Sequence, residues 1–501
     1  MEHGSKCGTR SKIVEKMKRE LIGILGEKKV TDGPETLEAY AKDQSFTPLR
    51  RPSFLVAPEN VGEVQALVRW ANRTLCPLVP VSSGPPHFYG DTVPTAGGAV
   101  IVDLRRMNRI IRMDRRNRMA IVEPGVTYSE LQPALAREGL RLSMPLLPRA
   151  NKSVVAGLLE RQPVTVPKYQ WVLLEPLRCL EIVWGNGDRL VTGEAGEYGP
   201  LEEQWKSGFA QVSPMGPGQV DYWRLVSAAQ GSMGIVSWAS IRCEVLPVLH
   251  RFFFIPAEKI NGLIDCAYKL LRVRLGDEFL MMDNATLAAI LRKDNDQHAR
   301  LRDQLPQWVI IVGVAGRDRL PEERCAFQQK DISAIAKQSG LQMVSSLPGV
   351  SDGEIADKLL KPSEDPYWKI RRKGAFQDIF FLTTLDQVPG HIEIVRAAAE
   401  ALNYPAEDVS IYIQPQHQGV CCHCEFTLSY DPDNEKEAAG VKELVRVASD
   451  ALMRRKAFFS RPYGIWADMV YGRDARQTSL LKGVKQIFDP NCVMNPGKLC
   501  F

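Results

Sequence analysis

Apolar and polar positions between residues 54 and 81 follow the pattern of a β-α-β unit. Residues 54–57 are continuously apolar, as in a buried strand, and residues 78–81 repeat that pattern. Between them, apolar side chains recur at helical spacing over residues 61–71, directly after the helix-opening Pro58-Glu59-Asn60. An α/β unit delivers its next loop to the carboxyl edge of a sheet, where ligands bind. Residues 82–94 are therefore the first candidate ligand loop.

The rest of the first half is predicted to form short strands joined by tight turns. Pairs of apolar runs flank polar turns, which is typical of β-hairpins. The predicted hairpins cover residues 110–122 and 181–192, a further strand covers residues 99–104, and a helix covers residues 128–138 before Gly139. This half is thus of mixed α+β character.

After Pro247 the pattern changes to helices that alternate with strands. The predicted helices are at residues 257–272, 321–339, 391–402 and 435–455, and the predicted strands are at residues 308–314, 379–383, 409–413 and 425–430. We expect a second domain built on an antiparallel sheet with helices on one face. A last helix, at residues 478–488, precedes a tail punctuated by Pro and Gly.

Length, composition and charge limit the class of protein. At 501 residues the chain exceeds one compact core, and 45% hydrophobic with 25% charged residues excludes disorder and coiled coil. A net charge of +5 from 64 basic and 59 acidic side chains gives no concentrated field for nucleic acid. The sequence contains neither a membrane-length apolar run nor a signal-like segment, so we expect a cytoplasmic protein with reduced cysteines.

The candidate loop at residues 82–94, SSGPPHFYGDTVP, has a composition that suits phosphate binding. Gly84 and Gly90 would let backbone N–H groups approach a phosphate. The hydroxyl groups that could donate to its oxygens belong to Ser82, Ser83 and Thr92. A simple turn after a strand is the alternative interpretation.

Further motifs follow this loop in order: AVIVDLRRMNRIIRMD, MAIVEPGVTYSEL, LEIVWGNGDRLVTG, AAQGSMGIVSWASIRCEVLP and a terminal IFDPNCVMNPGKL. In this order they closely resemble the flavoproteins of the vanillyl-alcohol oxidase and p-cresol methylhydroxylase superfamily. The resemblance implies FAD as cofactor and a two-lobed α+β fold. An FAD-binding domain (residues 1–247) would be completed by a returning C-terminal segment (residues 457–501). An inserted substrate or cap domain on an antiparallel sheet (residues 248–456) would cover the flavin.

The resemblance assigns cofactor-binding residues along these motifs. The candidate loop would hold the pyrophosphate, later turns and one strand would line the cofactor, and the tail would close the site. The residues implied are Ser82, Ser83, Gly84, His87, Gly90, Asp91, Thr92, Glu123, Pro124, Gly125, Ser153, Gly157, Gly231, Gly234, Ile235, Val236, Asn495 and Lys498.

The resemblance also bears on how FAD is attached. Some superfamily members bond the flavin to a His or Tyr side chain. His87 is one residue out of register with one such motif, and Gln377 and Asp378 occupy the other linking region. Neither Gln nor Asp normally makes the bond, so we expect non-covalent FAD.

In phenol-oxidising members of the superfamily, two tyrosines and an arginine hold the substrate. Tyr89 and Arg461 match the first tyrosine and the arginine, whereas Ser460 stands at the second tyrosine and Tyr463 could replace it. The Asp-Arg-Gly segment whose aspartate is the base in those members is missing after Ser153. This departure argues against a 4-alkylphenol substrate and leaves Arg461 as an expected anion-binding residue.

The segment QPQHQGVCCHCEF contains the other candidate catalytic residues. His417, His423 and Glu425 lie on the approach to a predicted strand, and alternation along it places His423 and Glu425 on one face. We predict no bound metal, although His417, His423 and Glu425 are weak candidates for zinc or iron ligands. They could instead supply a general base. The alternative is two partly buried histidines among small apolar cysteines.

These expectations describe an FAD-dependent dehydrogenase that removes a hydride from a CH–OH or activated benzylic carbon of a small anionic or aromatic substrate. Tyr89 and Arg461 would orient the substrate, and His423 or His417 would take the proton. The electrons would pass to a protein acceptor such as an iron-sulfur protein, a cytochrome or an electron-transfer flavoprotein. Two alternatives stay open: a lactate- or glycolate-type 2-hydroxy-acid dehydrogenase with a metal-assisted site, and a flavin-bearing electron-transfer subunit. The sequence is compatible with a homo-oligomer or a hetero-oligomer.

Overall fold

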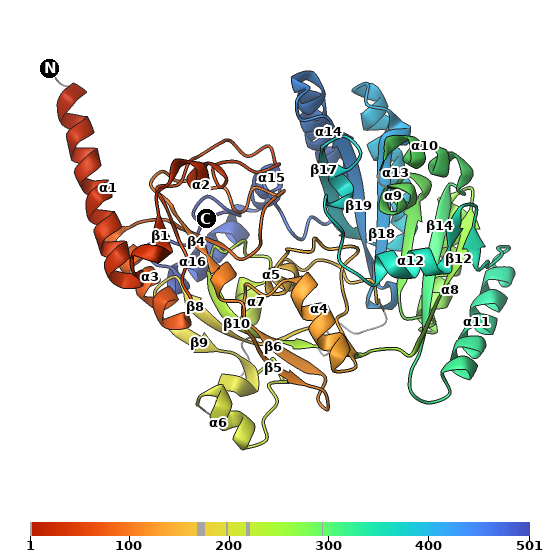
Figure 1. The fold of residues 1–501 in the computed structure, drawn as a ribbon. Helices are drawn as coiled ribbons and strands as arrows, with labels where there is room; N and C mark the ends of the chain where they lie inside the picture. Colours follow the sequence, from red (N-terminus) through yellow and green to blue (C-terminus); the bar gives the residue numbers. More distant parts are fainter. Residues whose placement is uncertain (1–2, 168–175, 197–198, 217–220, 293) are drawn as a thin grey trace.

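The protein has two lobes that face each other across a shared cavity (Figure 1). The structure is a computed structural model and describes residues 3–167, 176–196, 199–216, 221–292 and 294–501. One lobe holds the first half of the chain and the C-terminal tail. The other lobe runs from β12 (Leu249–Ala257) to α14 (Glu435–Arg454).

The predicted β-α-β unit is confirmed in a four-stranded sheet of the first lobe. Its strands, in spatial order, are β1 (Val30–Thr31), β2 (Phe54–Val56), β4 (Val100–Asp103) and β3 (Leu78–Val81). The last three run parallel, and α3 (Val61–Thr74) connects β2 to β3. The Asn60 side chain caps α3 by accepting the Glu63 N–H. The candidate loop thus leaves the carboxyl end of β3, where a parallel sheet presents ligands.

A five-stranded antiparallel sheet forms the other part of the first lobe. Its strands, in spatial order, are β5 (Ile110–Asp114), β6 (Met119–Val122), β10 (Gly234–Arg242), β8 (Leu177–Trp184) and β9 (Arg189–Val191). Both predicted hairpins are therefore confirmed as β5–β6 and β8–β9. The helices of this lobe include α1 (His3–Leu25), α2 (Pro34–Glu38), α4 (Tyr128–Arg137), α5 (Val154–Leu159), α6 (Leu201–Lys206) and α7 (Trp223–Val226).

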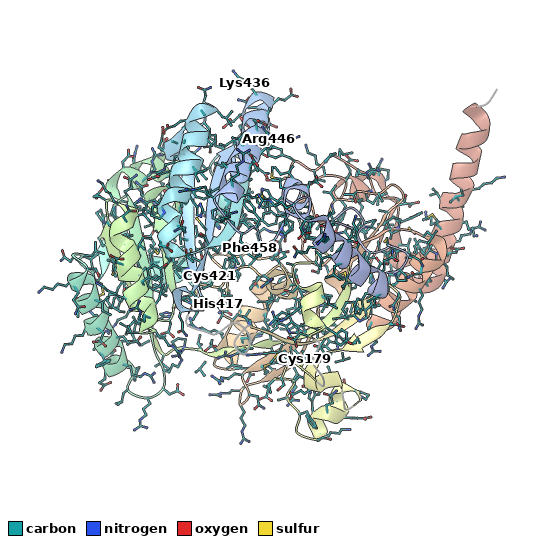
Figure 2. The ribbon with its side chains drawn as sticks, turned by 180° about the vertical axis from the view of Figure 1, so that it is seen from behind. Cys179, His417, Cys421, Lys436, Arg446 and Phe458 are labelled. Atoms are coloured by element: carbon teal, nitrogen blue, oxygen red, sulfur yellow. The ribbon has the colours of Figure 1, made fainter. Side chains whose placement is uncertain are left out.

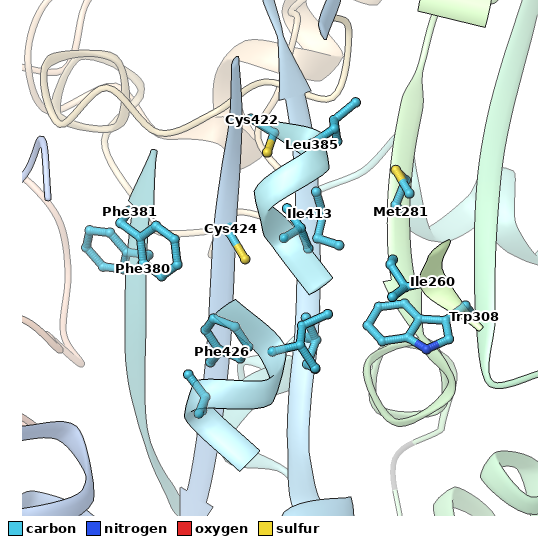
Figure 3. Close-up of a cluster of buried hydrophobic side chains, with 14 of the residues drawn as sticks. Ile260, Met281, Trp308, Phe380, Phe381, Leu385, Ile413, Cys422, Cys424 and Phe426 are labelled. Atoms are coloured by element: carbon cyan, nitrogen blue, oxygen red, sulfur yellow. The ribbon is translucent and has the colours of Figure 1, made fainter. Parts of the chain in front are cut away.

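The second lobe is built on a six-stranded sheet in which every neighbouring pair is antiparallel. Its strands, in spatial order, are β12, β14 (Trp308–Gly316), β13 (Phe279–Asp283), β18 (Val409–Gln416), β19 (Cys421–Tyr430) and β17 (Ala375–Thr383). One face packs against α8 (Ile260–Arg272), α11 (Pro321–Gln338), α13 (Val388–Ala401) and α14. Figure 3 shows part of this core, in which Cys422, Cys424 and Phe426 face the same apolar cluster as Ile413.

The expectation of helices on one face only is wrong. Three further helices, α9 (Asn284–Leu291), α10 (Asn295–Gln304) and α12 (Asp352–Leu359), contribute to a second core on the opposite face. The reason lies in β13 and β14, whose residues are buried along their whole length and so have apolar side chains on both faces. Helices must therefore cover both sides of that part of the sheet.

The C-terminal tail returns to the first lobe. After α15 (Ile465–Tyr471), the Lys485 ammonium of α16 (Ala475–Phe488) donates to the Ser232 carbonyl. The Asn495 amide donates to the Gln230 carbonyl at 2.7 Å. Residues of the tail therefore complete the lobe that the first half begins. Within the described ranges, no helix combines the length and apolar character needed to cross a membrane.

Candidate active site

A cavity between the lobes, the central cavity, brings together most of the residues that the sequence singled out. Both lobes contribute to its wall. Its lining includes Ser82, Ser83, His87, Tyr89, Asp91, Thr92, Pro124, Arg149, Lys152, Gly231, Gly234, Ile235, Val236, Lys369, Tyr412, His423, Glu425, Arg461 and Tyr463.

Other residues expected at the cofactor do not line this cavity. Gly90, whose N–H we expected to meet a phosphate, donates instead to Asp43 at 2.7 Å. Its φ of +78° and the position of Thr47 Oγ1, 2.0 Å from where a Cβ would stand, explain why glycine is needed. Lys498 donates to the Gly90 carbonyl at 2.6 Å, and Asn495 donates to the Asp91 carbonyl at 2.9 Å. These tail residues fix the position of the candidate loop.

The same holds for most of the expected turn residues. The Glu123 carboxylate accepts two hydrogen bonds from the Arg109 guanidinium, outside the central cavity. Added Cβ atoms on Gly125 and Gly157 would lie 2.7 Å from the Arg105 carbonyl and 2.6 Å from the Tyr128 hydroxyl. Two further residues outside the lining are Gly84, which donates its N–H to Asn151, and Ser153, which donates its N–H to Ser83 Oγ. Contacts with protein atoms therefore surround each of these positions.

The residues that do line the cavity fit FAD. The hydroxyls of Ser82, Ser83 and Thr92 can donate to phosphate oxygens, and Arg149 adds positive charge on the same wall. Lys152 lies there too, as an ion pair with Glu160. Sequence reasoning missed these two basic residues, although both stand in the RANKS stretch just before α5.

Two buried polar atoms near this wall lack a hydrogen-bond partner among the described residues. These atoms are His87 Nε2 and Asn495 Oδ1. Burial, with Arg149 and Lys152 nearby, lowers the pKa of His87 to about 3, so this ring is neutral. Because buried polar groups are rarely left unpaired, both atoms are suited to meet a polar cofactor.

On the opposite wall, strand alternation turns His423 and Glu425 of β19 toward the central cavity. Their neighbours Cys422 and Cys424 lie in the apolar core on the other face of the sheet (Figure 3). His423 Nε2 lies 3.1 Å from Glu425 Oε2, which orients the imidazole. Burial lowers the pKa of His423, and Arg461 and Lys369 lower it further, against the opposing effect of Glu425. The imidazole is therefore neutral at neutral pH.

Lys369 is a central member of the site that sequence reasoning missed. It belongs to the 3-10 turn η4 (Trp368–Ile370) and is buried with its Nζ atom 2.6 Å from Glu425 Oε1 and 2.7 Å from Asp378 Oδ2. Burial raises the pKa of Glu425, but Lys369 and His423 outweigh it and hold that pKa well below its usual range. Burial raises the pKa of Asp378 to about 6 despite the same lysine.

Asp378 and Gln377, expected near the flavin-linking position, are both engaged in protein contacts. Asp378 accepts hydrogen bonds from Tyr89 Oη at 3.3 Å and from Thr427 Oγ1 at 2.7 Å. Gln377 donates to the Gln44 carbonyl at 2.8 Å. Neither residue is among the described residues that line the central cavity.

Tyr89 and Tyr463 lie side by side on the wall next to Arg461. Their rings stack with centroids 4.9 Å apart. Burial raises the pKa of both phenols well above the ordinary value, so both hydroxyls stay protonated. Tyr463 thus stands beside Tyr89 on the wall of the central cavity.

Arg461 is a buried guanidinium without an anionic partner in the part of the chain that the structure describes. Its exposed fraction is 7%, and its Nη2 atom lies 3.4 Å from His423 Nδ1. The guanidinium carbon lies 4.2 Å from the centre of the Phe380 ring, and Nη1 donates to the Glu160 carbonyl at 3.5 Å. No carboxylate of the described residues lies within 4.0 Å of it. A buried charge is costly unless it is paired, so this wall is suited to an anionic ligand.

His417 is not part of the central cavity. It follows β18 and lies beside Cys421 at the end of the sheet (Figure 2). The weak candidate metal set is not assembled in the central cavity: His423 is paired to Glu425 there, whereas His417 and His423 together line a smaller adjoining cavity. Within the described ranges, no three His, Cys, Asp or Glu side chains are grouped to hold a metal ion.

Two family models match this chain. One, described as an FAD binding domain, matches residues 52–162, and the other, described as the C-terminal domain of FAD linked oxidases, matches residues 275–499. An uncharacterized FAD-linked oxidoreductase of Mycobacterium tuberculosis is 23% identical over 95% of this chain and 96% of its own length. D-2-hydroxyglutarate dehydrogenase of Stutzerimonas stutzeri is 23% identical over 96% of this chain and 98% of its own.

Solved structures share the fold at low sequence identity. The structure of p-cresol methylhydroxylase with bound substrate superposes with a TM-score of 0.82 at 18% identity, covering 97% of this chain and 96% of that one. The matched FAD binding domain makes FAD the cofactor, and the lining of the central cavity suits it. The chain thus carries an FAD binding domain and the C-terminal domain of FAD linked oxidases, shares its fold with p-cresol methylhydroxylase, and is an FAD-dependent oxidoreductase.

Proposed function

We propose that the protein is an FAD-dependent dehydrogenase that oxidises the CH–OH carbon of a small carboxylic acid and passes the electrons to a protein acceptor. The observation that carries this proposal is Arg461, a buried guanidinium without a carboxylate partner among the described residues, next to a neutral His423. An arginine fork binds a carboxylate through two parallel hydrogen bonds. A 2-hydroxy acid carries that carboxylate on the carbon that would be oxidised.

Bound FAD supplies the two-electron acceptor that takes the hydride from the substrate carbon. The protein supplies orientation and a place for the proton. Arg461 would hold the substrate carboxylate, and His423 Nδ1, 3.4 Å from Arg461, would accept the hydroxyl proton as the C–O bond becomes a carbonyl. The product is then the 2-keto acid.

Glu425 and Lys369 would prepare His423 for that role. With Nε2–H donating to Glu425, the imidazole presents the lone pair of Nδ1 toward Arg461. The ionised carboxylate would also stabilise the imidazolium that forms after proton transfer. Lys369 holds Glu425 ionised, because its ammonium lies 2.6 Å away in a buried setting.

The hydroxy-acid substrate named for the relative from Stutzerimonas stutzeri supports this proposal. A second candidate, oxidation of an activated benzylic carbon, is favoured by the stacked Tyr89 and Tyr463 beside Arg461. Those phenols could hold an aromatic hydroxyl group. A flavin-bearing electron-transfer subunit would need neither an anion-binding arginine nor an oriented histidine.

An anaerobic substrate screen tests the proposal. The oxidised holoprotein is mixed with 2-hydroxy acids or with 4-alkylphenols, and flavin absorbance is followed. Bleaching by at least one hydroxy acid, with the keto acid as product, is the expected result. Bleaching by 4-alkylphenols alone would favour the benzylic reaction, and no bleaching by either class would favour the electron-transfer subunit. A cytochrome or iron-sulfur protein should reoxidise the flavin faster than oxygen does.

A further inference from the structure

A smaller side cavity adjoins the central cavity at the proposed substrate position. Gln162, Pro163, His423 and Arg461 line both cavities. The side cavity therefore begins where Arg461 would hold a carboxylate. The other described residues of its wall come from both lobes. The apolar ones include Leu158, Val164, Val166, Leu177, Trp223 and Leu382, and the polar ones include Arg161, Gln416 and His417.

Helix α5 lies between the two cavities, and neighbouring residues of the helix line different cavities. Leu158 lines the side cavity only, whereas its neighbour Leu159 lines the central cavity only. Leu382 reaches the side cavity from β17 of the other lobe. A ligand in the side cavity would thus contact both lobes while its polar end stays at Arg461.

Size and chemistry indicate what this space can hold. The side cavity has a volume of about 130 Å³. An apolar protein cavity of ~150 Å³ is large enough to bind benzene. A short alkyl chain or a single aromatic ring therefore fits, and burying it against Leu, Val and Trp side chains is favourable.

We propose that the side cavity binds the apolar tail of the substrate, so that the enzyme acts on 2-hydroxy acids with an alkyl or aryl side chain rather than on the shortest ones. The substrate would bridge the two cavities, with its carboxylate on Arg461 and its side chain between Leu158 and Leu382. This inference rests on the proposed function for the identity of the reacting group, but tail binding itself needs no reaction.

Calorimetry on the oxidised holoprotein tests tail binding without turnover. The probes are straight-chain carboxylates from acetate to octanoate and the aryl series benzoate, phenylacetate and 3-phenylpropionate. We expect Kd to fall about fourfold for each added methylene until the side cavity is filled. Equal Kd values along both series would overturn the inference. A gain in the straight-chain series alone would assign the cavity to alkyl tails, and a gain in the aryl series alone to rings.

Two variants localise the effect. Leu382→Trp should fill the side cavity and abolish the fall of Kd with chain length, whereas the same substitution at the exposed Leu480 should retain it. Unchanged length dependence in Leu382→Trp, at wild-type FAD content, would contradict the proposed position. If that variant does not fold, Leu382→Ala gives a second reading, because a larger cavity should extend the gain to longer chains. An unshifted limit in Leu382→Ala would also contradict it.

The failures of the two proposals are distinguishable. Length-dependent binding of carboxylates, together with no flavin reduction by any hydroxy acid, would leave the side cavity in place and remove the proposed reaction. Reduction by hydroxy acids with a kcat/KM that does not depend on chain length would keep the proposed reaction and remove the proposed role of the side cavity.

Discussion

Lys369 Nζ lies 2.6 Å from Glu425 Oε1, so a cation from a short 3-10 turn fixes the carboxylate that orients the candidate base His423. The same ammonium holds Asp378, which accepts the Tyr89 hydroxyl proton in a hydrogen bond. One buried lysine thus connects the histidine and the tyrosine of the central cavity.

Lys369→Met should lower both stability and activity. It leaves two carboxylates buried without their cation, and breaking a buried ion pair typically costs about 3–5 kcal/mol. Chemical denaturation of the holoprotein measures this, with Lys436→Met on the exposed surface of α14 as the matched control. Adding Glu425→Gln to Lys369→Met should recover part of the loss. Equal stability of the two lysine variants would contradict the prediction.

Arg461→Ala should leave FAD bound but slow flavin reduction by substrate. A lost charge-assisted hydrogen bond of about 1.5–3 kcal/mol corresponds to roughly ten- to a hundredfold in kcat/KM. Arg461→Lys should recover only part, because an ammonium lacks the two-pronged fork. Stopped-flow reduction measures both variants against Arg446→Ala, an exposed arginine of α14. Unchanged kinetics in Arg461→Ala would remove this residue from the substrate site.

Titration of His423 should not change the rate of flavin reduction between neutral and alkaline pH. Burial lowers the pKa of this base below its ordinary value near 6.5, so it is already neutral and able to accept a proton there. The rate should fall only at lower pH, where the imidazole gains a proton. Because Glu425 raises the His423 pKa, Glu425→Gln should move this fall to still lower pH. An inflection of the reduction rate at or above roughly pH 7, which is above the pKa of an unshifted histidine, would argue against His423 as the base.

FAD should be released by acid precipitation. Asp378 is held by Lys369 and Thr427, Gln377 donates to the Gln44 carbonyl, and these contacts leave neither residue as a flavin ligand. After precipitation, the flavin spectrum should therefore appear in the supernatant. Yellow colour retained by the protein pellet would demonstrate a covalent bond.

Gly90→Val should reduce FAD content far more than Gly187→Val. A Cβ on Gly90 would lie 2.0 Å from Thr47 Oγ1 and would displace the loop that carries Ser82, Ser83 and Thr92. At Gly187 the nearest atom is 2.9 Å away on the flexible Arg69 side chain, in a hairpin outside the central cavity. Flavin content per soluble protein decides the matter, since both glycines have positive φ and share that strain.

Sequence patterns located residues whose position depends on local geometry. Strand alternation placed His423 and Glu425 together, and the order of motifs led to Tyr89 and Arg461. Lys369 could not be found this way, because its partners lie 9 and 56 residues further along and no periodic pattern surrounds it. Its position follows from the packing of η4 against the sheet.

Glycine and turn motifs were less informative about cofactor contact. They identify positions of close backbone approach, but the approaching group can be a protein atom as readily as a phosphate. At Gly125 the approaching group is the Arg105 carbonyl, and at Gly157 it is the Tyr128 hydroxyl. The predicted helix at residues 257–272 begins only at Ile260 for a similar reason of context: Ala257 completes β12, which pairs with β14.

The contacts that fasten the candidate loop to the tail span 404 residues from Asp91 to Asn495 and 408 residues from Gly90 to Lys498. On the ribosome, the loop therefore emerges long before its partners have been translated. The antiparallel sheet of the other lobe is contiguous in sequence, so it can assemble while synthesis continues. Contacts so distant in sequence also form slowly. We therefore expect the nascent chain to acquire its flavin only after translation of the tail, with the cap already folded.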